Sequence, residues 1–167
     1  MNEERKMILL KTYEPQDSNA LIPFIISFWD AHHAQTDEDN ARENIAEWTQ
    51  ENHELFVIMK DEEAVGFLHL NMRGSTVCWI EDVFVCEAYR RRGIAGRAIA
   101  LAEEMLKSRG VRGVAMDVVP DNLPALRLYH RLGYDRLSIV TVRKDFEEFE
   151  TARTEEIAGL SFRVRKF

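Results

Sequence analysis

The chain has 167 residues, of which 46% are hydrophobic and 31% charged, and its formal net charge at pH 7 is −7. This length fits one domain over residues 1–167, and the hydrophobic fraction is too high for a disordered chain. The negative charge argues against a nucleic-acid partner held through phosphate contacts. The longest apolar run, Leu21–Trp29, is too short to span a membrane, so no membrane partner is expected. Because the charged N-terminus does not resemble a signal peptide and Cys78 and Cys86 could hardly bridge each other, we expect a cytoplasmic protein.

The first half of the chain predicts strands separated by two helices, because its apolar residues recur with periods of either two or 3.6. The first helix is expected at Leu21–Trp29, where Pro23 fits only in the first turn. The second is expected to start at Thr36 and the acidic residues that follow it, which supply a cap and negative charge, and to end near Gln50. The strands expected in this half are Met7–Tyr13, Leu55–Met59, Ala64–Leu70 and Thr76–Val85.

The second half predicts a long helix from Gly93 to Ser108, a strand at Gly113–Val119 and a short helix capped by Asp121 or Asn122. Closing strands are expected at Leu137–Arg143 and Leu160–Arg165, separated by the acidic stretch Asp145–Glu156. The strand–helix–strand order in the centre of the chain implies a parallel strand pair. We therefore expect an α/β fold, with a mixed, mostly antiparallel sheet that contains one parallel pair and is covered by about four helices.

A basic turn joins the apolar strand to the long helix. It contains Arg90, Arg91 and Arg92, and small residues follow them at the helix start. The first turn of a helix carries unpaired N–H groups and the positive end of the helix dipole, so it attracts anions. The turn therefore predicts phosphate binding, with a solvated basic helix start as the alternative. A dinucleotide site is a weaker alternative, because the G-x-G-x-x-G spacing is absent.

Two carboxylates, Glu81 and Asp82, interrupt the apolar strand. Adjacent strand residues point to opposite faces, so one of them is expected among apolar neighbours. Burial there would raise its pKa and make it a plausible general base. The alternatives are an ion pair with an arginine or an exposed strand face.

The short helix after Asn122 carries Ala125 and Tyr129 on one face, at a spacing of i and i+4. The small alanine leaves room for a slender ligand beside the tyrosine, whose hydroxyl group could donate a proton. Simple packing of the tyrosine is the alternative.

These residues carry a family resemblance. Arg90-x-x-Gly93-x-Ala95 resembles the acyl-CoA signature of the GNAT superfamily of N-acetyltransferases, and Asn122-x-x-Ala125-x-x-x-Tyr129 resembles the second motif of that superfamily. The central segment, from Glu81 to Tyr129, is similar to diamine acetyltransferases. The resemblance implies a GNAT-like fold and direct transfer of an acetyl group from acetyl-CoA to a primary amine.

The resemblance also implies a role for each motif residue. Tyr129 would protonate the departing CoA thiolate, and Glu81, through water, would take a proton from the substrate ammonium. Asn122 and Ala125 would line the pantetheine channel. The groups that would hold the pantetheine arm, the acetyl carbonyl and the pyrophosphate are those of Val83, Phe84, Val85, Arg90, Arg91, Arg92, Gly93, Ile94, Ala95 and Gly96.

The acceptor has no signature of its own. The resemblance places His32 and His33 beside the acceptor site, with plain surface residues as the alternative, and Asp82 is a further candidate contact. A small-molecule or peptide amine is expected, and the acidity of the chain favours a cationic one such as a polyamine. No metal-ligand spacing is found, and a homodimer paired through Leu160–Arg165 is a further expectation. The competing hypothesis is a non-catalytic CoA-binding regulatory module, against which the presence of Glu81 and Tyr129 argues.

Overall fold

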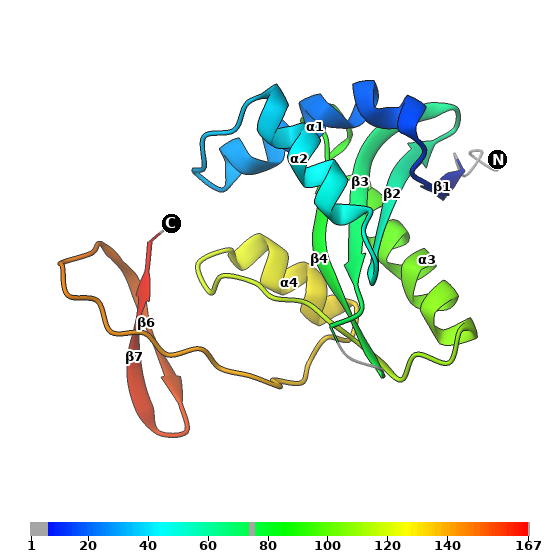
Figure 1. The fold of residues 1–167 in the computed structure, drawn as a ribbon. Coiled ribbons are helices and arrows are strands. Elements are labelled where there is room, and N and C mark those ends of the chain that lie inside the picture. Colours follow the sequence, from blue (N-terminus) through cyan, green and yellow to red (C-terminus); the bar gives the residue numbers. More distant parts are fainter. Residues whose placement is uncertain (1–6, 74–75, 167) are drawn as a thin grey trace. The chain divides into compact units, whose positions relative to one another are not determined.

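The computed structural model describes residues 7–73 and 76–166. The chain divides into two compact units, Met1–Asp117 and Val118–Phe167 (Figure 1). The single domain expected over residues 1–167 stays a prediction. In the described residues, no helix is long and apolar enough to cross a membrane.

A mixed sheet forms the centre of the first unit. Its strands lie in the order β1-β2-β3-β4-β5, and every neighbouring pair is antiparallel except β4 and β5, which are parallel. This arrangement confirms the fold class predicted from the sequence. The elements of this unit are β1 (Ile8–Thr12), a short 3₁₀ helix (Pro15–Asp17), α1 (Ser18–Ala31), α2 (Glu38–Trp48), β2 (His53–Lys60), β3 (Glu63–Asn71), β4 (Val77–Val85), a second 3₁₀ helix (Glu87–Tyr89), α3 (Ile94–Ser108) and β5 (Gly113–Ala115).

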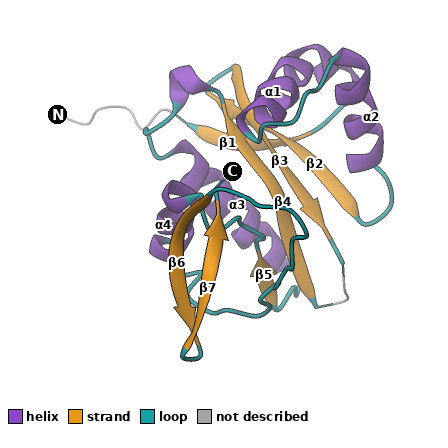
Figure 2. Ribbon diagram, turned by 90° about the vertical axis from the view of Figure 1, so that its left-hand side faces the viewer, coloured by secondary structure: helices purple, strands orange, loops and turns teal. Residues whose placement is uncertain are grey.

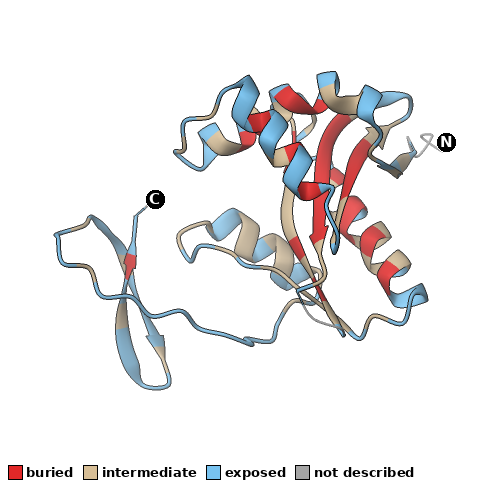
Figure 3. Cartoon of the chain, viewed as in Figure 1, coloured by how far each residue is buried: buried red, intermediate tan, exposed pale blue. Residues whose placement is uncertain are grey.

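Helices cover both faces of this sheet, with α1 and α2 on one face and α3 on the other (Figure 2). Strand alternation divides the buried residues between these faces. Val57, Phe67 and Phe84 belong to the cluster formed with α1 and α2, whereas Ile58 and Leu68 point to the α3 side. Figure 3 shows the buried residues concentrated on β2, β3 and β4 and on α1, α2 and α3.

The limits of α2 and α3 agree with the sequence prediction, whereas α1 begins at Ser18 rather than Leu21. The Asp37 side chain caps α2 by accepting a hydrogen bond from the backbone N–H of Asn40 at 2.9 Å. Pro23, however, lies inside α1 rather than in its first turn, because the helix begins at Ser18. The backbone bond that proline omits would reach the carbonyl of exposed Asn19, which water can solvate, so the helix tolerates it.

The strand β5 is shorter than predicted. Pairing with β4 joins Val77 to Gly113, Cys78 to Val114 and Trp79 to Ala115, after which β5 ends although β4 continues. Residues 116–119, predicted to prolong this strand, leave the sheet. The two parallel strands therefore separate beyond Trp79.

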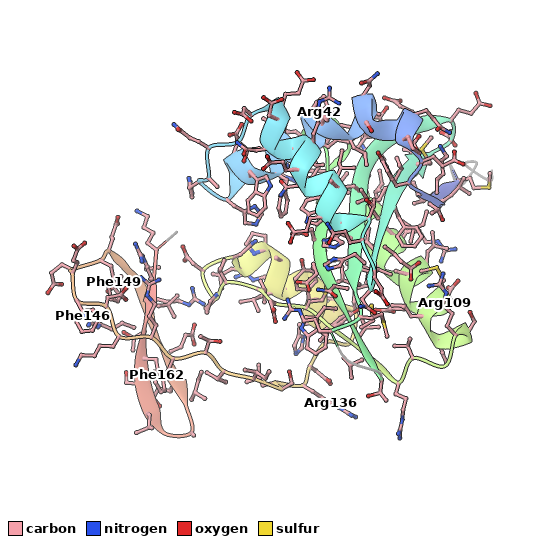
Figure 4. All side chains as sticks on the ribbon, viewed as in Figure 1. Arg42, Arg109, Arg136, Phe146, Phe149 and Phe162 are labelled. Carbon is pink, nitrogen blue, oxygen red and sulfur yellow. The ribbon has the colours of Figure 1, made fainter. Side chains whose placement is uncertain are left out.

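The second unit contains α4 (Leu123–Arg131) and a hairpin of β6 (Thr151–Ile157) and β7 (Leu160–Arg165). The predicted strand Leu160–Arg165 is confirmed, but the strand predicted at Leu137–Arg143 is wrong, and β6 lies within the stretch that was expected to separate the closing strands. Side chains in this unit are largely exposed, such as that of Phe146 on the loop before β6 (Figure 4).

The hairpin turn explains why β6 forms where it does. Ala158 and Gly159 have φ values of 54° and 75°, the left-handed backbone that closes a two-residue hairpin. This turn pairs β7 with the residues immediately before it. The apolar pattern of Leu137–Arg143 requires a neighbouring strand, and among the described residues none pairs with it.

Candidate functional site

The separation of β4 from β5 leaves an open strand edge. The N–H of Cys86 donates to the carbonyl of Val65 on β3 at 2.9 Å. Because backbone groups alternate along an antiparallel strand, those of Phe84 also face β3, whereas those of Val83 and Val85 face the open edge. The edge can therefore accept an extended ligand through backbone hydrogen bonds.

The basic turn follows β4 and the second 3₁₀ helix in the sequence and leads directly into α3. Gly93 caps the helix with a left-handed φ of 75°, and the first intrahelical bond runs from the N–H of Arg97 to the Gly93 carbonyl at 3.0 Å. The N–H groups that precede Arg97 in the first turn therefore have no acceptor within the helix. Buried Ile94 anchors this turn, and the small residues Ala95 and Gly96 are only partly buried. This geometry fits a phosphate group.

The arginines of the turn are exposed, and two of them lie over aromatic rings. The Arg90 guanidinium lies 5.3 Å from the centre of the Phe84 ring, and its Nε donates to the Val85 carbonyl at 2.9 Å. Arg92 lies 5.3 Å from the Tyr89 ring centre. Arg91 has a left-handed φ of 58°. Three positive charges therefore stand beside the helix start.

A β-bulge brings the two carboxylates to one face of the sheet. His69 pairs with Asp82 whereas Leu70 pairs with Ile80, so Glu81 is the extra residue in β4. Asp82 bonds to the side chain of His69, and Glu81 bonds to that of Asn71, which lies on the same face of β3. The expectation that the two acids point to opposite faces is wrong, because the bulge interrupts the alternation.

Glu81 is held by an ion pair. Arg73 Nε donates to Glu81 Oε1 at 2.6 Å, Arg73 Nη2 bonds to Oε2, and Asn71 Nδ2 donates to Oε1 at 2.9 Å. Arg73 also donates to Asp117 at 2.9 Å. Burial would raise the pKa of Glu81, but the Arg73 guanidinium and the Asn71 amide outweigh it and hold this pKa below its usual value. The raised pKa expected for a carboxylate among apolar neighbours is therefore wrong for Glu81, because the alternative of an arginine partner applies.

Asp82 ends a chain of two histidines, His53 and His69, that no sequence motif predicted. His69 Nδ1 lies 2.8 Å from Asp82 Oδ2, and His69 Nε2 lies 2.8 Å from His53 Nδ1. His69 is only 3% exposed, and Trp48 of α2 stacks on its ring with centres 4.8 Å apart. The available signal was a polar residue at a core position of the apolar strand β3. No three acidic, histidine or cysteine side chains group as a metal site within residues 7–73 and 76–166.

The histidines that the sequence singled out lie elsewhere, at the end of α1. His32 is exposed, with its Nδ1 2.7 Å from the carbonyl oxygen of Phe28. His33 is exposed and has a left-handed φ of 57°. The structure links neither residue to Asp82, whose histidine neighbours come from β2 and β3. Acceptor contacts of His32 and His33 stay predictions.

The remaining motif residues belong to the second unit. Asn122 caps α4, where its side chain accepts a hydrogen bond from the N–H of Ala125 at 3.2 Å. Tyr129 is partly buried, and its ring packs edge-on against Tyr134 with centres 6.2 Å apart. The cap gives Asn122 a structural role in α4. The roles of Asn122, Ala125 and Tyr129 toward a ligand stay predictions.

Comparison with known proteins gives consistent matches. Residues 21–134 match the model of the acetyltransferase (GNAT) family. An aminoglycoside N(6')-acetyltransferase type 1 from Salmonella typhimurium is 28% identical over 114 residues, which cover 64% of this chain and 73% of that protein. A streptothricin acetyltransferase from Escherichia coli is 31% identical over 74 residues, or 44% of this chain and 42% of that protein.

Solved structures share the fold. The aminoglycoside N-acetyltransferase AAC(6')-Iy in complex with CoA has a TM-score of 0.71 at 20% identity, covering 87% of this chain and 99% of that chain. The same enzyme with the bisubstrate analog CoA-S-monomethyl-acetylneamine has a TM-score of 0.69 at 21% identity, covering 83% and 99%.

Proposed function

The chain belongs to the acetyltransferase (GNAT) family and is an acetyl-CoA-dependent N-acetyltransferase, and we propose that it acetylates a primary amine of a small polycationic molecule by direct transfer. The observation that carries this proposal is the placement of two carboxylates on one face of β4, the strand whose open edge leads into the basic turn. The carboxylates of β4 would then attract the cationic amine, and the basic turn that follows would attract the anionic cosubstrate.

The cosubstrate fits the open edge and the turn. The backbone of Val83 and Val85 would hold the pantetheine arm. Phe84 lies between them in β4, and its own backbone groups face β3. The pyrophosphate would lie on the N–H groups at the start of α3, with the charge of Arg90, Arg91 and Arg92 around it. When bound, acetyl-CoA supplies a thioester whose carbonyl carbon an amine can attack.

The acceptor amine must lose a proton before it can attack, because an ammonium nitrogen has no lone pair. Glu81, predicted to act as the base through water, is ionised and bonded to Arg73 and Asn71. Its lowered pKa makes Glu81 a weak proton acceptor, so we assign to it mainly the attraction of the cationic amine. Tyr129 is the proposed donor to the departing thiolate.

Two observations support a polycationic acceptor. The chain is acidic overall, with a net charge of −7. Relatives over part of the chain carry names that specify aminoglycoside and streptothricin acetyltransferases. The similarity to diamine acetyltransferases stays a prediction, and aminoglycosides and polyamines share the property on which the proposal rests, several primary amines on a flexible or sugar scaffold.

A panel of acceptors tests the proposal. Release of free thiol from acetyl-CoA is measured with polyamines, aminoglycosides, amino acids and peptides, while thermal unfolding reports acetyl-CoA binding independently. We expect stabilisation by acetyl-CoA and turnover with at least one polycationic amine. Binding without turnover on any amine would favour the regulatory module instead.

A further inference from the structure

The chain His53–His69–Asp82 is the strongest feature that the proposed function leaves unused. It links three strands on the face of the sheet that α2 covers, through two contacts of 2.8 Å each. Its central residue is buried and stacks between Trp48 and His53, whose ring centres lie 4.8 Å and 5.0 Å from that of His69. A buried ring held on both sides and bonded at both nitrogens has one orientation.

We propose that Asp82 accepts the proton that the acceptor ammonium loses, and that His69 and His53 are positioning residues that hold its carboxylate in place. This inference rests on the proposed acetyl transfer. The general base is then Asp82, and not the neighbouring Glu81 that the family resemblance implied.

The charges around the two carboxylates differ. Arg73 bonds to Glu81 and to Asp117, so its positive charge is engaged by two acids. The groups that face Asp82 are His69 from β3, with His53 from β2 behind it, and neighbouring Glu81. Trp48, the α2 residue stacked on His69, is uncharged. Asp82 therefore has neutral or titratable donors, whereas Glu81 has a permanent cation as its partner.

The positions of the protons follow from the contacts. An ionised Asp82 can only accept, so His69 Nδ1 carries a hydrogen and donates it to Oδ2. When His69 carries only this hydrogen, Nε2 accepts and His53 donates from Nδ1. Both nitrogens of His69 are committed, so the pair orients the carboxylate and does not conduct the transferred proton.

The atom that accepts the proton is Oδ1 of Asp82, which makes no hydrogen bond to the residues that the structure describes. One N–H bond of the ammonium breaks, its electron pair stays on nitrogen, and an O–H bond forms at Oδ1, directly or through one water molecule. The amine can then attack the acetyl carbonyl, and Asp82 later returns the proton to water.

The experiment measures kcat and the KM for acetyl-CoA for three variants of the full chain. Asp82→Asn should lower kcat by about 100-fold or more with little change in acetyl-CoA binding. His69→Leu should lower kcat by about 10-fold with little change in the KM for acetyl-CoA, because the carboxylate loses the donor that orients it. His69→Asn keeps an amide donor near the Nδ1 position and should recover much of the rate.

Ile58→Val is the matched control, because Ile58 is fully buried on the opposite face of the sheet. Thermal unfolding of every variant separates lost folding from lost chemistry, and if His69→Leu does not fold, Asp82→Asn and His69→Asn decide. If the wild type transfers acetyl groups and Asp82→Asn does so at the same rate, the inference is overturned and the proposed function stands. An unchanged kcat in His69→Leu, or no recovery in His69→Asn, would overturn the positioning role. No transfer by the wild-type chain to any amine would remove the proposed function and this inference together.

Discussion

Gly66 lies directly against Phe84: a Cβ atom at position 66 would stand 1.9 Å from the carbonyl oxygen of Phe84. This close approach of β3 to β4 occurs at the segment whose opposite edge is proposed to hold the pantetheine arm. Gly66→Ala must therefore displace the β4 backbone. We expect a loss of stability of about 1–3 kcal/mol or more and weaker acetyl-CoA binding.

Gly113→Ala is the control for this change, because a Cβ atom there would meet the Val77 side chain at an ordinary 3.7 Å. Thermal unfolding and acetyl-CoA titration of both variants provide the measurement. Equal stability of the two variants would show that β4 does not depend on the close approach.

The ion pair of Glu81 with Arg73 predicts a pH-dependent contribution to stability. The pKa of Glu81 is lower in the folded state than its usual 4.5, so the stabilisation is fully present above that value and is lost as pH falls through the folded pKa. Because Arg73 is 40% exposed, solvent screening limits the effect at neutral pH to about 1 kcal/mol or less. Urea unfolding of Glu81→Gln should therefore differ from wild type near neutral pH and converge with it in acid.

Glu62→Gln, an exposed change in the turn between β2 and β3, controls for the loss of one negative charge. It should shift stability little at either pH. A difference between wild type and Glu81→Gln that grows in acid would contradict the assigned direction of the pKa.

The basic turn predicts that acetyl-CoA binding depends on charge and on salt. Arg91→Gln and Arg92→Gln should each weaken binding by about 3–10-fold at low salt, with smaller effects at high salt because exposed charges are screened. Isothermal titration at two salt concentrations provides the measurement.

Arg42→Gln is the matched control for the arginine variants, since Arg42 is an exposed arginine on α2 that pairs with Glu38 at 2.5 Å (Figure 4). If Arg42→Gln weakened binding as much as the turn variants, the effect would come from net charge and not from the turn.

Tyr129 is predicted to protonate the departing thiolate, so Tyr129→Phe should lower kcat by about 100-fold while the affinity for acetyl-CoA changes little. Tyr134→Phe removes a hydroxyl group from the ring that packs against Tyr129 and should leave kcat near the wild-type value. Steady-state kinetics with saturating acceptor distinguish the two. A Tyr129→Phe variant with unchanged kcat would exclude Tyr129 from the reaction.

The positions of the strands and helices of the first unit were predicted correctly, apart from the length of β5 and the start of α1, because their signals are local. The alternation of β2 and β3, the stripe of α3 and the cap at Asp37 each depend on neighbouring residues. The same reasoning failed at Glu81 and Asp82, because a bulge is a property of the register between two strands and single-strand alternation does not contain it.

The other differences have the same origin. The bond from Asp82 to His69 joins residues 13 positions apart, and that from His69 to His53 joins residues 16 apart, so neither pattern is visible locally. In the second unit, the turn at Ala158 and Gly159 selected the polar segment Thr151–Ile157 over the more apolar Leu137–Arg143 as partner of β7. The homodimer and the cytoplasmic location stay predictions.

The most direct test of the central claim is the identity of the acetylated product. The protein is incubated with acetyl-CoA and either neamine or spermidine, and the amine is analysed by mass spectrometry beside its fully N-dimethylated counterpart. We expect that the primary amine gains an acetyl group in step with thiol release, and that the dimethylated compound gains none. Thiol release without an acetylated amine, or no acetylation of either amine, would contradict this expectation.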